Sequence, residues 1–216
     1  MQIAILLFEG LTALDAVGPY EVLSRLPGTE TIFVAAEAGP KRTDNGVLAL
    51  VADKTLDEVP SPDVVVVPGG MEGVQVAMED ERVITWLKKV HETSTWTTSV
   101  CTGSLILGAA GILDGIKATS HWAAYDRLRA LGAEPTAERV VRVGKIVTAA
   151  GVSSGIDMGL TLVAEIAGPE VAQAIQLGIE YDPQPPFDTG SPAKAPPELV
   201  ELVRALTGSG RAAQQA

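Results

Sequence analysis

Short apolar runs, separated by segments with helical spacing, restrict the fold of this chain more than any other feature. The runs at residues 2–8, 31–37, 63–70 and 95–100 are rich in Ile, Val, Leu and Thr. Continuous apolar runs of strand length are typical of parallel strands that are covered on both faces. Their alternation with helical segments predicts a single α/β domain, with a doubly wound, mostly parallel sheet and helices on both faces.

The segments between these runs supply the helices and the connections. Pro19 fits the first turn of a helix, where its missing N–H is not needed, so we expect Asp15 just before that helix. Residues 139–150 predict a hairpin that turns at Gly144. Helical spacing marks residues 80–92, 102–111, 123–131, 154–167, 169–180 and 197–207.

Composition restricts the class of protein. The chain has 216 residues, 46% of them hydrophobic, which is enough for one core. Its formal charge of −11 disfavours binding to nucleic acid. It shows no membrane span and no signal peptide, and its single cysteine forms no internal disulfide, so we expect a cytoplasmic protein. We expect residues 1–207 to form the domain and residues 208–216 to form a frayed tail.

The only cysteine, Cys101, lies where a strand turns into a helix in 98-TSVCTGSLILGAAGIL-113. A residue on such a turn can be presented as a nucleophile. The N–H groups that begin the helix would then favour the thiolate and lower the pKa of the thiol. The alternative is a buried cysteine that packs as a small apolar group, as free cysteines often do. The residues alone leave both interpretations open.

Four further residues follow strands or the cysteine at the same predicted edge of the sheet. Asp15 is either a helix cap or a carboxyl group beside the sulfur, where its pKa would rise and it could transfer a proton. Gly69 and Gly70 form either an ordinary turn or a site whose backbone N–H groups hold a developing negative charge. Thr102 either caps the helix or hydrogen-bonds a reacting group.

The two histidines are less informative. His121, in 119-TSHW-122, is either structural or a partner of Cys101, because Cys–His pairs recur as activated nucleophiles. One cysteine and two separated histidines give no usable ligand spacing, so we expect no metal site. Neither a P-loop nor a dinucleotide-binding glycine motif is present.

Four stretches together resemble the ThiJ/PfpI superfamily, and more closely its isonitrile (isocyanide) hydratase branch. These stretches are FEGLTALDAVGPYEVL, VVVPGG, SVCTGSLILGAAGILDGIKATSHW and IEYDPQPPFDTGSP, and they span nearly the whole chain. The resemblance implies a flavodoxin-like fold, a homodimer, and a cysteine nucleophile that matches Cys101. The branch also has an aspartate in the context of 14-LDAVGP-19 and a threonine after the cysteine, which match Asp15 and Thr102.

This resemblance implies an enzyme that adds water to a small isonitrile and forms an N-substituted formamide, without a metal or an organic cofactor. Cys101 would attack the terminal carbon, Asp15 would transfer protons, and Thr102 with the backbone at Gly70 would hold charge. A glyoxalase or deglycase acting on α-oxoaldehydes is an alternative, although its carboxylic partner is usually Glu. A second alternative is a non-catalytic sensor in which Cys101 is oxidised.

Overall fold

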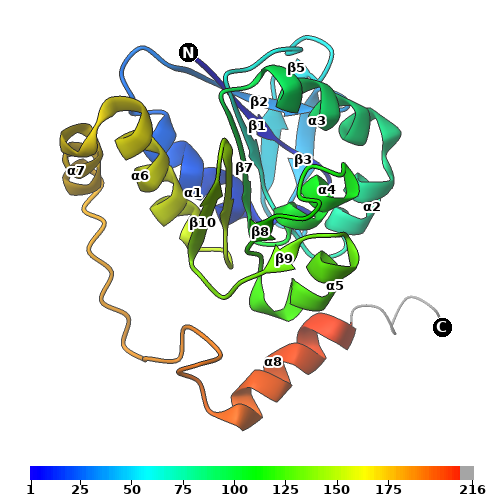
Figure 1. Ribbon diagram of the computed structural model, residues 1–216, viewed down its shortest axis with the longest axis vertical. Coiled ribbons are helices and arrows are strands. Elements are labelled where there is room, and N and C mark those ends of the chain that lie inside the picture. Colours follow the sequence, from blue (N-terminus) through cyan, green and yellow to red (C-terminus); the bar gives the residue numbers. More distant parts are fainter. Residues whose placement is uncertain (210–216) are drawn as a thin grey trace. The chain divides into compact units, whose positions relative to one another are not determined.

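The computed structural model describes residues 1–209 and divides the chain into a unit of residues 1–179 and a second unit that begins at residue 180. The first unit is built around a seven-stranded sheet (Figure 1). Its neighbouring strands pair in parallel, except for one antiparallel pair at an edge, so the predicted sheet is confirmed. Across the sheet the strands are β10 (Val140–Val143), β11 (Ile146–Ala149), β7 (Trp96–Val100), β6 (Val64–Val67), β1 (Gln2–Leu6), β2 (Glu30–Ala35) and β5 (Lys54–Thr55).

Helices cover both faces of the sheet, as the flavodoxin-like prediction requires (Figure 1). On one face lie α1 (Ala13–Leu23), α6 (Ser154–Ala167) and α7 (Pro169–Gly178), and on the other lie α2 (Gly73–Glu79), α3 (Glu81–Thr93), α4 (Gly103–Ala109) and α5 (Tyr125–Ala130). Close packing of α1 on α6 depends on small residues. A Cβ atom on Gly159 would lie 2.9 Å from Cβ of Val22, so a larger residue would push the two helices apart.

The first helix begins earlier than predicted. Thr12 is its N-cap residue, the helix starts at Ala13, and both Asp15 and Pro19 lie inside it. Pro19 has no N–H to donate to the carbonyl of Asp15, so this helix lacks one internal hydrogen bond. The prediction that Asp15 precedes the helix was wrong, and so was its interpretation as a cap, because Thr12 occupies the N-cap position and Asp15 lies inside the helix with a buried side chain.

Two small sheets lie beside the main one. The first is an antiparallel hairpin of β3 (Gly39–Arg42) and β4 (Ala49–Ala52). The second pairs β8 (Lys117–Ala118) in parallel with β9 (Glu134–Pro135). Within the main sheet, β10 and β11 form the predicted hairpin, and Gly144 turns it with a φ of +58°, a conformation that glycine adopts without strain.

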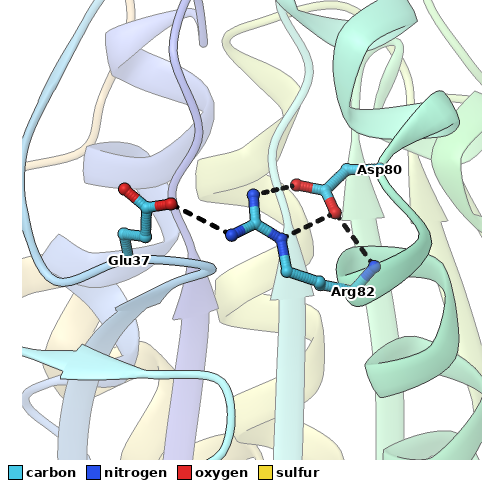
Figure 2. A network of polar contacts seen from close by, with 3 residues as sticks. All are labelled: Glu37, Asp80 and Arg82. Atoms are coloured by element: carbon cyan, nitrogen blue, oxygen red, sulfur yellow. Dashed lines mark hydrogen bonds and ion pairs between the residues drawn. The ribbon is translucent and has the colours of Figure 1, made fainter.

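An ion-pair network joins the start of α3 to the segment after β2 (Figure 2). The Asp80 carboxylate accepts from the backbone N–H of Arg82 at 2.9 Å and pairs with its guanidinium at 2.8 Å. The same guanidinium reaches Glu37 at 3.0 Å. The side chains of Arg82 and Glu37 are 59% and 75% exposed, so water screens the pair and the network orients α3 more than it stabilises it.

In the described residues, the second unit consists of an extended, proline-rich segment and α8 (Pro197–Ser209). Residues 208 and 209 belong to this helix rather than to the predicted frayed tail, and the rest of that tail lies outside the described residues. The predicted domain limits of 1–207 stay a prediction. No helix in the described part of the chain is long and apolar enough to cross a membrane.

Candidate active site

Strands β1, β6 and β7 end at the point where the order of strands across the sheet reverses. From β1 the chain moves outward to β2 and then returns to β6 on the other side of β1. Crevices at such reversals hold the ligands of open α/β sheets. Asp15 follows β1, Gly69 and Gly70 follow β6, and Cys101 follows β7, so the topology brings these residues to one edge of the sheet.

Cys101 adopts a backbone conformation that is rare for a residue with a side chain. Its φ is +57°, in the left-handed region. Its N–H donates to the carbonyls of Ala149 and Ala150, at 3.1 and 2.8 Å. Its carbonyl accepts from the hydroxyls of Ser104 and Ser120, at 3.2 and 3.0 Å. The hydrogen bonds of its N–H and of its carbonyl hold Cys101 in this strained conformation. Backbone strain of this kind is typical of functional sites, and the turn matches the predicted nucleophile elbow.

The buried carboxyl group of Asp15 lies beside the Cys101 thiol. Its Oδ2 accepts from the N–H of Gly69 at 2.9 Å, whereas Oδ1 has no hydrogen-bond partner among the described residues. Burial raises the pKa of Asp15 from 3.8 to about 7, although the hydrogen bonds from Gly69 and Cys101 act to lower it. This carboxyl group can therefore take up and release a proton near neutral pH, as an acid–base catalyst must.

The Cys101 thiol is protonated at neutral pH. Burial, and next the charge of Asp15, raise the pKa of this thiol from 9.0 to about 12. The backbone N–H groups of Thr102 and Val152 hydrogen-bond the sulfur and lower its pKa, but they do not outweigh burial. The predicted thiolate was therefore wrong for the free protein. The two groups titrate as a pair, because Cys101 acts to lower the pKa of Asp15 and the charge of Asp15 raises the pKa of Cys101.

Thr102 is fastened to Gly70. Its Oγ1 accepts from the N–H of Gly70 at 3.0 Å and donates to the carbonyl of Gly70 at 2.8 Å, and it does not cap α4. The N–H of Gly69 is already bound to Asp15. Neither glycine N–H is free to hold a developing charge, which corrects that prediction. The two glycines instead position Asp15 and Thr102. A Cβ atom on Gly69 would lie 2.5 Å from Thr102 Oγ1 and 2.8 Å from Asp15 Oδ2.

His121 hydrogen-bonds the backbone of the segment that follows it and packs on Gly151. Its Nδ1 accepts from the N–H of Ala123 at 3.3 Å, at the start of the short 3-10 helix η1 (Trp122–Ala124). Its ring packs over Gly151, where a Cβ atom would lie 3.1 Å from His121 Cδ2. Burial lowers the pKa of His121, so the ring is neutral at physiological pH. Contact between this ring and a substrate stays a prediction.

Sequence reasoning missed Ser104, Ser120 and Val152. Ser104 stands three residues after Cys101, a spacing at which a serine hydroxyl can donate to the earlier backbone carbonyl, so that one position carried a signal. Ser120 and Val152 come from segments far from the cysteine in the chain, and no local pattern connects them to it. Only the folded arrangement shows that they hold the carbonyl and the sulfur of Cys101.

Comparisons with known proteins give relatives in sequence and in fold. Residues 1–165 match the DJ-1/PfpI family. An isonitrile hydratase from Pseudomonas putida is 45% identical over 204 residues, which cover 94% of this chain and 89% of that protein. The crystal structure of a ThiJ/PfpI family protein from Pseudomonas syringae has a TM-score of 0.93 and 41% identity, and covers 96% of this chain and 86% of that one. The structure of oxidized Toxoplasma gondii DJ-1 has a TM-score of 0.75 and 25% identity, and the match covers 84% of this chain and 99% of that one.

Proposed function

This chain belongs to the DJ-1/PfpI family, and on that basis we propose that it is an isonitrile hydratase, which adds water to R–N≡C and forms R–NH–CHO. The observation that carries the proposal is the pair formed by a buried carboxyl group with a pKa of about 7 and the thiol of a strained turn. One group can transfer protons and the other can attack carbon. The relative from Pseudomonas putida is named for this activity.

The first half of the reaction joins the sulfur to the substrate. Because the resting thiol is protonated, the Asp15 carboxylate removes its proton as Sγ of Cys101 attacks the terminal carbon of the isonitrile. Asp15 then delivers this proton to the same carbon. The product is the thioimidate R–N=CH–S–Cys, in which the new bonds are C–S and C–H. Asp15 is a carboxylate again at the end of this step.

The second half releases the formamide. Asp15 takes a proton from a water molecule, whose oxygen adds to the thioimidate carbon, and passes that same proton to the nitrogen. The tetrahedral adduct R–NH–CH(OH)–S–Cys then expels the sulfur, and its hydroxyl proton returns to the Asp15–Cys101 pair. The backbone N–H groups of Thr102 and Val152 hydrogen-bond the sulfur and stabilise its charge as it leaves.

A redox sensor is the alternative that the comparison with oxidized Toxoplasma gondii DJ-1 brings forward. Burial raises the pKa of the Cys101 thiol, and this disfavours oxidation because the thiolate is the form that is oxidised. A glyoxalase or deglycase would use the same cysteine, but the carboxylic partner of the cysteine in those enzymes is usually Glu, whereas here it is Asp15. The hydratase is therefore the better explanation of this site.

We also propose that the protein forms a homodimer and works in the cytoplasm, as the resemblance to the superfamily and the single cysteine imply. Light scattering on the purified protein checks the first proposal. A solution mass of twice the chain mass of 22.4 kDa is expected, and a mass equal to that of one chain would contradict it.

An activity assay tests the hydratase. The purified protein is incubated with a simple aryl isonitrile, and the formamide is followed by absorbance. The Cys101→Ala and Cys101→Ser variants should lose turnover while circular dichroism shows an intact fold, and Asp15→Asn should lose about 10²-fold or more. No turnover in folded wild-type protein with a reduced Cys101 would contradict the proposal. The same samples would then be tested with methylglyoxal.

A further inference from the structure

The β3–β4 hairpin is fastened to the segment that leads into α1. The backbone N–H of Asp44, in the turn of this hairpin, donates to the carbonyl of Leu11 at 2.9 Å. Its side chain adds a second bond, because Thr12 Oγ1 donates to Asp44 Oδ2 at 2.5 Å. Thr12 is the N-cap residue of α1, and its carbonyl accepts from the N–H of Asp15 at 3.1 Å. The exposed Asp44 thus holds the start of α1, the helix that carries the buried Asp15.

Asp44 also brings a negative charge near the buried carboxyl group. Burial raises the pKa of Asp15 most, and the charge of Asp44 raises it further, by less than the hydrogen bonds from Gly69 and Cys101 lower it. The elements packed against α1 add few competing charges, because β1 and β6 have no ionisable side chains. Near Asp15, the other titratable group is the Cys101 thiol. The remaining acidic groups on α1 and α6 are engaged elsewhere: Glu21 pairs with Arg25, Asp157 with Arg139, and Glu165 with Arg142. Between β1 and α1, Glu9 accepts from the N–H of Arg42.

We propose that Asp44 is a positioning residue for Asp15, which fastens the hairpin to the start of α1 and holds a second negative charge at the start of the helix that carries the buried carboxyl group. The charge favours the neutral form of Asp15, and that form delivers a proton to the isonitrile carbon. The catalytic consequence rests on the proposed function. The effect of Asp44 on the protonation of Asp15 does not, and it can be measured without a substrate.

The test is a ¹³C NMR titration of the Asp15 carboxyl carbon, whose resonance is assigned by its absence in Asp15→Asn. Asp44→Asn keeps an oxygen that can accept from Thr12 and removes the charge. The matched control is Glu30→Gln, which removes one exposed negative charge at the opposite end of the sheet, where β2 begins. Asp44→Ser is a second neutral variant, in case Asp44→Asn does not fold.

The titration midpoint of Asp15 should fall by about 0.2 to 0.7 pH units in Asp44→Asn, the size expected of a solvent-exposed charge pair. It should not change in Glu30→Gln. The fall should shrink in about 1 M salt, because salt screens a charge and does not replace a lost contact. In the activity assay, the acid limb of kcat/KM should move in the same direction.

An unchanged midpoint in a folded neutral variant would overturn the proposal, and so would an equal fall in Glu30→Gln. A fall that persists undiminished in high salt would also reject it, because the effect would then come from altered packing. A shifted midpoint in a protein that hydrates no isonitrile would reject the proposed function and leave this inference intact.

Discussion

Replacement of Asp15 by asparagine should remove a strong pH dependence from the stability of this protein. Folding raises the pKa of this carboxyl group from 3.8 to about 7. A carboxyl group of this kind stabilises the fold while it is protonated. That contribution is complete below the unfolded pKa and is lost as the pH rises toward the folded pKa. The sign is opposite to that of a salt-bridged carboxylate, because here the fold prefers the neutral form.

The size of the effect follows from the two pKa values. They are about three pH units apart, and each unit corresponds to about 1.36 kcal/mol. Between pH 4 and pH 8, the free energy of unfolding of the wild type should therefore fall by about 4 kcal/mol relative to that of Asp15→Asn. Asparagine has nearly the same shape, is neutral at every pH, and keeps an oxygen that can accept from Gly69.

Urea denaturation followed by circular dichroism, at intervals from pH 4 to pH 8, measures both free energies. Subtracting one from the other cancels the titration of every other carboxyl group. The wild type should lose stability relative to the variant as the pH rises, with most of the change complete by about pH 7. A difference that stays constant within about 1 kcal/mol would refute the claim that the fold holds Asp15 as a neutral group.

Three further substitutions test contacts at the site and at the start of α3. Gly69→Ala should lower kcat/KM by about 10²-fold, because its Cβ atom would displace the carboxyl group, whereas Gly178→Ala, with open space around it, should leave kcat/KM unchanged. Ser120→Ala removes one of the two hydroxyl donors to the carbonyl of Cys101 and should lower the free energy of unfolding by about 1 kcal/mol in urea titrations; no change would mean that this bond does not hold the turn. Arg82→Ala breaks only exposed ion pairs, so its Tm should change by less than about 3 °C with full activity, and a larger loss would show that α3 depends on them.

Much of the fold could be predicted because the buried strands appear in the sequence as continuous apolar runs. All four residues of β6 are fully buried valines. A run of this kind is typical of a strand that is covered on both faces. The site followed from the same logic, because the carboxyl ends of parallel strands meet at one edge. Cys101 and Asp15 were found by their positions after two such strands and by the motifs around them.

The remaining features depend on contacts that no local pattern encodes. Pro19 suggested a late helix start, but the contacts of α1 with the hairpin turn and with Gly69 begin the helix at Ala13. The pKa shift of Cys101 was predicted with the wrong sign, because the start of α4 was visible in the sequence, whereas the burial of the thiol beside Asp15 was not. Long-range packing decided both outcomes.

Intact-protein mass spectrometry of a rapidly quenched reaction tests the central claim most directly. Wild-type protein mixed with an aryl isonitrile should carry a transient adduct with the mass of one isonitrile. That adduct should map to Cys101, decay as the formamide forms, and be absent from Cys101→Ala. Formamide that forms without any adduct, or that forms at the wild-type rate in Cys101→Ala, would contradict the covalent mechanism and the role assigned to this cysteine.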